Sequence, residues 1–467
     1  MELWTHWWDV VQQLRPACSR RRTFLWLAAS LAAMTVRGDR LGVTSLVRAL
    51  GLKADCYDRL LDFFHSKALD LDKLTRAWVA LIQKVHPGIL RVNGRIVLLG
   101  DGLKVPKSGK KMPAVKRLHQ ESDSNTKPNY IMGHSCQAVA ILAGMRGTVF
   151  AIPLAARIHE GVFFNNNDKR TLLDKMVLLI NSLGLSAPCY FVADAYYASQ
   201  KIIRGLINKG HHLVSRAKRN AVAYEEPQIP TGVKRRGRPR TYGNKIKLRS
   251  LFNEPEKMQE APSPVYGEKN VTIRFLCVDL LWRPVGILVR FVAVMHPTRG
   301  MILLICSDLG LAPIEIIRLY SLRFKIELSF KQALRIIAAY GYHFWMAAMT
   351  PIGRSDGNQH LHRKSQDYRD AVRRKINAYH RHIQVGIIAQ GLLQYLSSAF
   401  SKRVWSSFGS WIRTIRPGLC PSEQVAAIAM TNTLPAFLAD SPHNTILTHF
   451  LQERIDLERT EGLRLVA

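Results

Sequence analysis

Two apolar runs that each end in an aspartate constrain the fold of this chain most strongly. The run "RIVLLGDG" reaches Asp101, and the run "CYFVADAYY" reaches Asp194. Both runs are rich in residues that favour buried strands, and open α/β sheets bind ligands just beyond the carboxyl ends of such strands. A single aspartate in this position is more often a turn or cap residue, so neither run is decisive without the other.

The surrounding sequence predicts a mixed α/β domain with a central sheet. From about residue 93 to residue 216 the pattern is three strands, a helix, a strand, a helix and a strand. The first of these helices is expected to begin at Asp168 as its N-cap and to end before Gly184. Residues 220–310 begin with a basic, turn-rich segment and continue as strand-like runs, which predicts a β-rich insertion.

The charge of the chain indicates a polyanionic partner. Lysine and arginine number 67 against 34 acidic residues, a formal net charge of +33. Self-repulsion of that size destabilises a compact protein unless a polyanion neutralises it. Nucleic acid is the first candidate and an anionic membrane surface is the second. The longest apolar run, Phe24–Val36, is too short to span about 30 Å of hydrocarbon and predicts a buried helix, which disfavours the membrane.

The seven cysteines are scattered along the chain and include no CxxC pair. This pattern argues against a disulfide framework and against a zinc ribbon, and it fits a reducing compartment. We therefore expect the protein in the cytoplasm, associated with the nucleoid if its partner is chromosomal DNA.

These patterns divide the chain into four regions. Residues 1–90 show helical spacing of apolar residues, and they predict either a DNA-reading module or a helical cap. An α/β domain is expected to combine residues 91–219 and 311–350. The β-rich basic insertion occupies residues 220–310 between its two parts. Residues 351–467 predict a second helical region that could contribute to dimerisation.

A single carboxylate among cations marks the segment from Ala312 to Tyr340, which predicts one long helix. At about 100° per residue, Tyr320, Arg323, Glu327 and Lys331 fall within an arc of about 80°. One interpretation is a set of i,i+4 ion pairs, each worth about 0.2–0.5 kcal/mol. The other is that Glu327 binds a metal ion while its neighbours hold phosphates.

The second interpretation has a specific chemistry. Asp101, Asp194 and Glu327 could hold two Mg²⁺ ions about 3.5–4 Å apart, with Mn²⁺ as a substitute. One ion would activate water or a 3′-hydroxyl, and the other would stabilise the leaving oxygen of an in-line displacement at phosphorus. Arginine and lysine on the same helix would bind DNA phosphates, arginine as a bidentate fork and lysine as a point charge.

Three segments together carry a family resemblance. They are "LLGDGLKVPKSGKKMP" with Asp101, "CYFVADAYYAS" with Asp194, and "YSLRFKIELSFKQAL" with Tyr320, Arg323 and Glu327. In these segments the chain resembles bacterial insertion-sequence transposases of the DDE type, in the group with a Tyr-x2-Arg-x3-Glu helix. The resemblance covers about residues 93–340, and the long separation of the second aspartate from the glutamate suits a group with a β-rich insertion there.

The resemblance implies a ribonuclease H-like catalytic domain that cuts and joins DNA strands with divalent metal ions. It also implies a homodimer that assembles on double-stranded DNA at paired element ends. Asp101, Asp194 and Glu327 would be the metal-binding triad of this enzyme. Tyr320 and Arg323 would contact the DNA backbone near the cleaved end.

The chain departs from the family pattern at one position. Family members usually carry a lysine seven residues after the glutamate, where this chain has Leu334. Lys331 is on the expected helix face, and Arg335 follows Leu334 directly. Either cation could replace the missing lysine.

Two further basic segments are expected to contact DNA. One directly follows Asp101 and would line a DNA channel. The other contains Arg-Gly-Arg-Pro, which is similar to the core of an AT-hook that enters the minor groove. Solvated surface loops are the alternative for both. The residues assigned to DNA contact are Lys104, Lys107, Lys110 and Lys111 in the first segment, and Arg236, Arg238 and Arg240 in the second.

The sequence therefore predicts a DNA transposase that cuts element ends and joins the freed 3′-hydroxyl to target DNA. One alternative is a catalytically silent DNA-binding protein derived from a transposase. Another is a metal-dependent nuclease without a joining step. The presence of all three triad residues favours an active enzyme over a silent one, whereas only product analysis separates the nuclease from the transposase.

Overall fold

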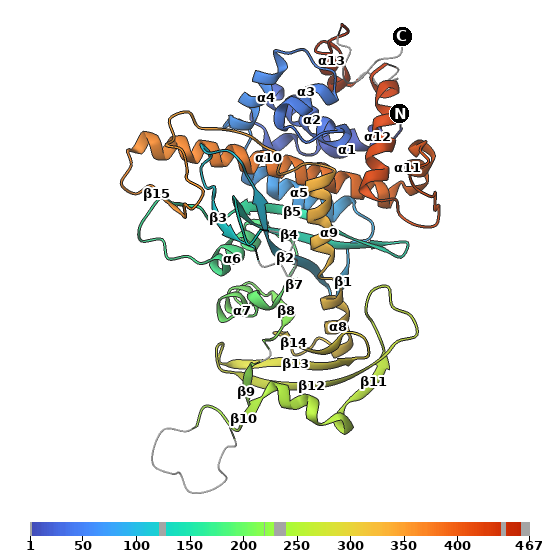
Figure 1. Ribbon diagram of the computed structural model, residues 1–467. Coiled ribbons are helices and arrows are strands. Elements are labelled where there is room, and N and C mark those ends of the chain that lie inside the picture. Colours follow the sequence, from blue (N-terminus) through green and yellow to red (C-terminus); the bar gives the residue numbers. More distant parts are fainter. Residues whose placement is uncertain (1, 121–127, 219, 228–239, 440–444, 459–467) are drawn as a thin grey trace. The chain divides into compact units, whose positions relative to one another are not determined.

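The computed structural model describes residues 2–120, 128–218, 220–227, 240–439 and 445–458. The chain divides into two compact units that each gather segments from distant parts of the sequence. The large unit contains Met1–Leu90, Gly102–Ser186 and Glu327–Ala467, and the small unit contains Arg91–Asp101 and Ala187–Ile326. The mixed α/β class predicted from the sequence is confirmed, with helical segments near both ends of the chain (Figure 1).

Helices from both ends of the chain build most of the large unit. α2 (Arg21–Val36) is buried along most of its length, as its apolar run predicts. α5 (Leu71–Val85) begins where the Asp70 carboxylate accepts hydrogen bonds from the backbone nitrogens of Asp72 and Lys73, at 3.0 and 2.9 Å, which satisfies donors of the first turn. The other helices are α1 (Glu2–Gln12), α3 (Gly42–Ala49), α4 (Cys56–His65), α10 (Gln366–Ala399), α11 (Ser401–Phe408), α12 (Glu423–Ala439) and α13 (Ile446–Gln452).

The long helix α10 and the helix α5 pack on the strands of the large unit (Figure 1). β4 (Tyr130–Met145) pairs antiparallel with β5 (Thr148–Ile158) and with the short β3 (Lys116–His119). The centres of both long strands are continuously buried. Trp78 on α5 donates a hydrogen bond to the Pro153 carbonyl at 2.9 Å, and Gln384 on α10 donates to the Leu154 carbonyl at 2.9 Å. These bonds pair polar groups that are buried between the layers.

The helix α6 (Leu172–Ser182) begins later than the sequence indicates. The predicted N-cap, Asp168, lies outside the helix, and Thr171 caps it instead in a capping box with Asp174. The Asp174 carboxylate accepts from the Thr171 backbone nitrogen at 2.7 Å, which gives the first turn a reciprocal pair of bonds. The predicted end is confirmed, because Gly184 lies just beyond the helix with a φ of +64°.

A mixed sheet forms the small unit. Its strand order is β10-β9-β12-β13-β14-β8-β7-β2, with β1 on β2 and β11 on β12. Residues Arg95–Asp101 of β2 (Arg95–Pro106) belong to this unit, where β2 runs parallel to β7 (Cys189–Val192). β7 runs parallel to β8 (His212–Arg216), and α7 (Gln200–Ile207) connects them. The predicted β-rich insertion is confirmed, and this unit also contains β1 (Arg91–Val92), β9 (Val222–Tyr224), β10 (Lys245–Lys247), β11 (Gln259–Pro262), β12 (Thr272–Trp282), β13 (Ile287–His296) and β14 (Gly300–Cys306).

The prediction of a single helix from Ala312 to Tyr340 is wrong, because the structure contains two helices in this segment. α8 (Pro313–Ser321) and α9 (Lys325–Arg335) are separated by a turn at residues 322–324. In this turn the Arg323 nitrogen donates to the Tyr320 carbonyl at 3.0 Å, an i→i−3 bond that is tighter than an α-helical one. Immediately after it, the Lys325 ammonium lies 4.0 Å from the centroid of the Tyr266 ring. Helical periodicity cannot reveal that long-range contact.

None of the helices in the described ranges is long and apolar enough to cross a membrane. The seven cysteines are all unbonded. Burial raises the pKa of Cys136, Cys189 and Cys306 to about 12, which makes these residues packing groups rather than reactive thiols.

Candidate active site

Asp101 and Asp194 occupy matching positions on neighbouring strands of the small unit. β2 and β7 pair in parallel, with Leu99 opposite Val192. Each aspartate is two residues beyond its member of that pair. Asp194 follows the end of β7, but Asp101 lies within β2, which continues to Pro106 beyond the end that the sequence predicts. Neighbouring strands are about 4.8 Å apart, and residues two positions apart share a face. The structure thus brings together two carboxylates that lie far apart in the sequence.

Hydrogen bonds from two elements hold Asp194 in place. Its Oδ1 accepts from the backbone nitrogen of Tyr196 at 3.1 Å, as the N-cap of the short 3₁₀ helix η2 (Ala195–Tyr197). Its carbonyl accepts from the hydroxyl of Ser215 in β8 at 2.7 Å. The neighbouring parallel strand therefore fixes the backbone that presents the carboxylate. Ser215 was not singled out from the sequence, because nothing local distinguishes it from other strand serines.

Arg323 supplies a positive charge directly against Asp101. Its Nη1 lies 3.2 Å from the Asp101 Oδ2, and the two side chains are 22% and 20% exposed. Partial burial strengthens such a pair relative to a fully exposed one, since water and salt screen it less. Arg323 reaches Asp101 from the turn that follows α8.

The phenol of Tyr320 belongs to the same cluster. Burial raises the pKa of Tyr320, Arg323 and Arg216 oppose that rise, and Asp194 adds to it. Because the net shift is upward, the hydroxyl stays protonated at neutral pH and can donate a hydrogen bond. Arg216 is a residue that the sequence analysis missed. It lies at the end of β8, a position that does not by itself distinguish it from other cations at strand ends.

Glu327 lies in the first turn of α9, within the large unit, and is exposed. The Gln390 amide of α10 donates to the Ser329 carbonyl at 3.0 Å and anchors α9 in that unit. Lys331 lies four residues after Glu327 on the same face of α9 and is exposed. In the part of the chain that the structure describes, no group of three or more His, Cys, Asp or Glu side chains is placed to hold a metal ion.

The last residues of α9 differ in their exposure to solvent. Leu334 is half-buried, so an apolar side chain suits that position in this chain. Arg335, the next residue, is exposed. The exposed cations of α9 are therefore Lys331 and Arg335.

The basic residues after Asp101 divide into exposed and buried ones. Lys104, Lys110 and Lys111 are exposed. Lys107, in contrast, is only 7% exposed. Its ammonium donates to the carbonyls of Tyr340 and Tyr342 at 2.5 and 3.0 Å, and burial lowers its pKa to about 8. Lys107 is therefore turned inward, away from the phosphate contact expected for it.

The second basic segment is described only at its end. Arg236 and Arg238 lie outside the described residues. Arg240 is exposed at the start of the next described range.

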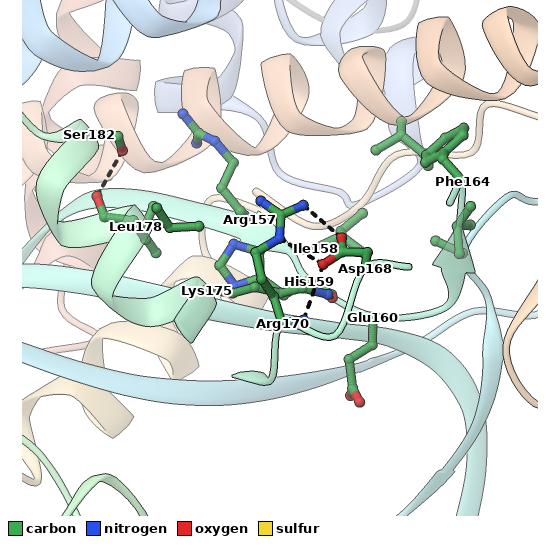
Figure 2. A pocket seen from close by; sticks show the side chains of 14 residues that line it. Arg157, Ile158, His159, Glu160, Phe164, Asp168, Arg170, Lys175, Leu178 and Ser182 are labelled. Carbon is green, nitrogen blue, oxygen red and sulfur yellow. Dashed lines mark hydrogen bonds and ion pairs between the residues drawn. The ribbon is translucent and has the colours of Figure 1, made fainter. Parts of the chain in front are cut away.

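A cavity of about 340 Å³ in the large unit holds a separate group of charges beside α6 (Figure 2). Arg170 Nη2 lies 2.6 Å from Asp168 Oδ2, and Lys175 donates to the His159 carbonyl. Burial lowers the pKa of His159 to about 3, so its ring is neutral. The buried guanidinium of Arg157 has side-chain acceptors of its own. The charged groups named here are paired with protein atoms, and we therefore assign no ligand to this cavity.

Comparison with known proteins identifies the family. No curated protein sequence matches this chain. A cryo-EM structure of the piggyBac transposase in a synaptic complex with hairpin DNA resembles it at 11% identity and a TM-score of 0.35, over 95% of this chain and 81% of that one, a likeness too distant to support a conclusion. The family described as DDE superfamily endonuclease matches residues 11–274, which include Asp101 and Asp194 but not Glu327. That match extends over more than half of the chain, and the chain therefore belongs to the DDE superfamily of endonucleases.

Proposed function

We propose that this protein is a DNA transposase that cuts the ends of an insertion sequence and joins the freed 3′-hydroxyl to target DNA. Membership of an endonuclease family supports the cutting step. The observation that carries the proposal is the parallel pairing of β2 and β7, which sets Asp101 beside Asp194 with Arg323 against it. The net charge of +33 supports DNA as the substrate.

The carboxylates fit a hard divalent cation. Carboxylate oxygens are preferred ligands of Mg²⁺, and one positive group, the Arg323 guanidinium, already lies against Asp101. Asp101, Asp194 and Glu327 would hold two Mg²⁺ ions, or Mn²⁺ in their place. When bound, the ions would supply an activated oxygen nucleophile and stabilise the leaving oxygen.

Arg323 and Tyr320 would orient the DNA end at these carboxylates. A guanidinium can bind a phosphate through two parallel N–H donors, and the neutral Tyr320 hydroxyl can donate to a phosphate oxygen. Arg216 would add positive charge at the same site. Held in this way, the DNA backbone would present its scissile phosphate in line with the attacking oxygen.

Further basic residues would extend the contact with double-stranded DNA. Lys331 or Arg335 would replace the lysine that the family usually has at the Leu334 position. The remaining proposed contacts are Lys104, Lys110 and Lys111 after Asp101, and Arg236, Arg238 and Arg240 in the insertion.

We also propose a division of labour along the chain. Residues 91–219 and 311–350 would form the catalytic domain, and residues 220–310 would form the basic insertion. Residues 1–90 would bind the element end or cap the catalytic domain. Residues 351–467 would contribute to a homodimer on paired ends, and the protein would act on DNA in the cytoplasm.

The proposal is tested with labelled DNA that carries the end of the source element. The purified protein is incubated with single and paired ends, with and without Mg²⁺ or Mn²⁺, beside Asp194→Asn. The expected result is metal-dependent nicking that is lost in Asp194→Asn while DNA binding persists. Asp58→Asn, at an exposed position on α4, is the matched control and should cut normally.

The products separate the remaining alternatives. Covalent joining of the cut end to a second DNA establishes the transposase. Cutting without joining, with paired ends present, would leave a metal-dependent nuclease. Binding without cutting in either metal ion would overturn the enzyme and leave a DNA-binding protein derived from a transposase.

A further inference from the structure

A second cavity, lined by basic residues, lies in the large unit beside the segment that follows Asp101. Its volume is about 390 Å³, which is in the range of ligand-binding pockets. Its walls come from the loop at residues 107–110, from the start of β4 and from residues 352–354. Among the described residues that line it, none is acidic. The exposed cations are Lys110, Arg117 and Arg354, and the inward-turned Lys107 also forms part of the wall.

Main-chain hydrogen bonds hold the walls of this cavity together. The Ile352 nitrogen donates to the Lys110 carbonyl at 2.7 Å, and the Arg117 nitrogen donates to the Asp356 carbonyl at 2.8 Å. The nearby Asp356 carboxylate accepts from the Gly353 backbone nitrogen at 2.7 Å, within the same wall. The cavity is therefore a built part of the fold rather than a gap between side chains.

Aromatic rings border the same cavity. The Arg117 guanidinium lies 3.8 Å from the centroid of the Tyr130 ring, and Tyr130 remains 48% exposed. Trp345 is 64% exposed and lies against the cavity wall, because a Cβ added at Gly109 would come within 3.0 Å of its Nε1. A basic surface that only attracts phosphates has no need of exposed rings. The combination of rings and cations indicates a ligand with both flat apolar faces and negative charge.

We propose that this cavity binds single-stranded DNA, with one unpaired base stacked on the Tyr130–Arg117 pair and adjacent phosphates held by Lys110 and Arg354. Proteins that bind single strands combine a basic groove with aromatic rings on which successive bases stack. A continuous duplex keeps its base faces inside its own stack, so it offers Tyr130 no ring to contact. This inference rests on the proposed function, because cutting at an element end frees a strand.

The test measures binding without cleavage, in EDTA. Fluorescence anisotropy follows a labelled single strand of about 12 nucleotides, a length within the usual site sizes, and the matching blunt duplex. Tyr130→Ala should weaken single-strand binding by about 5- to 160-fold, the effect of losing one base stack, and should change duplex binding by less than about twofold. Tyr130→Phe keeps the ring and should bind normally. Trp411→Ala removes a ring that is 93% exposed elsewhere and is the matched control.

The salt dependence separates the stacking group from the charged ones. Lys110→Ala should reduce the slope of log K against log salt by about 0.7 for a single strand, because one phosphate contact is lost. Tyr130→Ala should leave that slope unchanged while lowering the affinity at every salt concentration. Unchanged melting temperatures would show that the variants fold.

The inference is overturned if Tyr130→Ala binds the single strand as tightly as the unchanged protein. It is also overturned if single-strand and duplex binding fall together, because the residue would then act on phosphates or on the fold. Neither result would contradict the proposed function, which is tested separately by metal-dependent cutting and its loss in Asp194→Asn. Conversely, a protein that fails to cut could still show the selective loss in Tyr130→Ala.

Discussion

Two aspartate–arginine pairs show how the two units use the same chemistry differently. In the large unit, Asp168 and Arg170 are two residues apart and approach to 2.6 Å. In the small unit, Asp101 and Arg323 are 222 residues apart and approach to 3.2 Å. The tighter pair is local and shapes a loop before α6. The Asp101–Arg323 pair forms only when the sheet is assembled, at the position where two carboxylates are neighbours. Of these two pairs, the one with the larger separation in sequence, not the one with the shorter N–O distance, lies at the candidate site.

The largest expected effect comes from removing one charge from each pair. Asp101→Asn should reduce DNA cutting by at least about 10²–10³-fold, because a lost metal ligand removes several kcal/mol of transition-state stabilisation. Asp168→Asn should stay within about twofold of the unchanged protein. Single-turnover cutting rates in Mg²⁺ measure both. Equal losses in the two variants would contradict the distinction between a site pair and a loop pair.

Removing the arginines should give the next largest difference. Arg323→Ala should lower the cutting rate by about 10- to 100-fold, the value of a charge-assisted hydrogen bond of about 1.5–3 kcal/mol. Arg323→Lys should recover part of the loss, because lysine keeps the charge but not the fork. Arg170→Ala serves as the control and should cut normally. A normal rate in Arg323→Ala would show that the guanidinium only fills space beside Asp101.

Tyr320→Phe tests whether the Tyr320 hydroxyl contributes to cutting by the small unit. Loss of one hydrogen bond of about 0.5–1.5 kcal/mol should slow cutting by about 2- to 10-fold. Because the pKa of Tyr320 is raised above its ordinary value, the hydroxyl stays protonated up to about pH 9. The ratio of the two rates should therefore be constant between about pH 6 and pH 9. A ratio that falls toward one across this range would mean that the phenol ionises in use.

The smallest expected effect is the loss of folding stability when the Asp168–Arg170 pair is removed. Hydrogen bonds from Arg170 lower the pKa of Asp168, so its contribution to stability is complete above the unfolded pKa of about 3.9 and is lost as the pH falls further. The pair is exposed, and the contribution should be below about 1 kcal/mol. Urea unfolding of the protein and of Asp168→Asn should differ slightly at pH 7, and the difference should shrink as the pH falls below about 4 toward the lowered folded-state pKa. A difference that grows in acid would have the wrong sign.

The sequence locates the two strands of this site, because burial and an aspartate after an apolar run are local patterns. Asp194 follows its strand as expected, whereas Asp101 lies within β2, which continues to Pro106. The parallel register of β2 and β7 makes the two aspartates neighbours. Arg216 and Ser215 escaped notice because their partners are reached only through that sheet. Their contacts with the cluster depend on tertiary structure, not on any signal within "LVSR".

Local periodicity fails where a distant partner decides the conformation. The turn between α8 and α9 interrupts a helical pattern that is continuous in the sequence, and Lys325 there packs on Tyr266 from the insertion. Lys107 looks like a surface cation in the sequence, yet two carbonyls more than 230 residues away bury it. In both cases a cation ordinarily assigned to solvent is held by an aromatic ring.

The 222-residue separation of Asp101 and Arg323 also sets an order of events during synthesis. Asp101, and later Asp194, emerge from the ribosome well before Arg323, whose positive charge lies against the Asp101 carboxylate. At about 5–20 residues per second, the first aspartate waits roughly 10–45 s for Arg323 to emerge. During that interval the nascent sheet carries two neighbouring carboxylates without the guanidinium. The Asp101–Arg323 ion pair would form only as the last third of the chain is made.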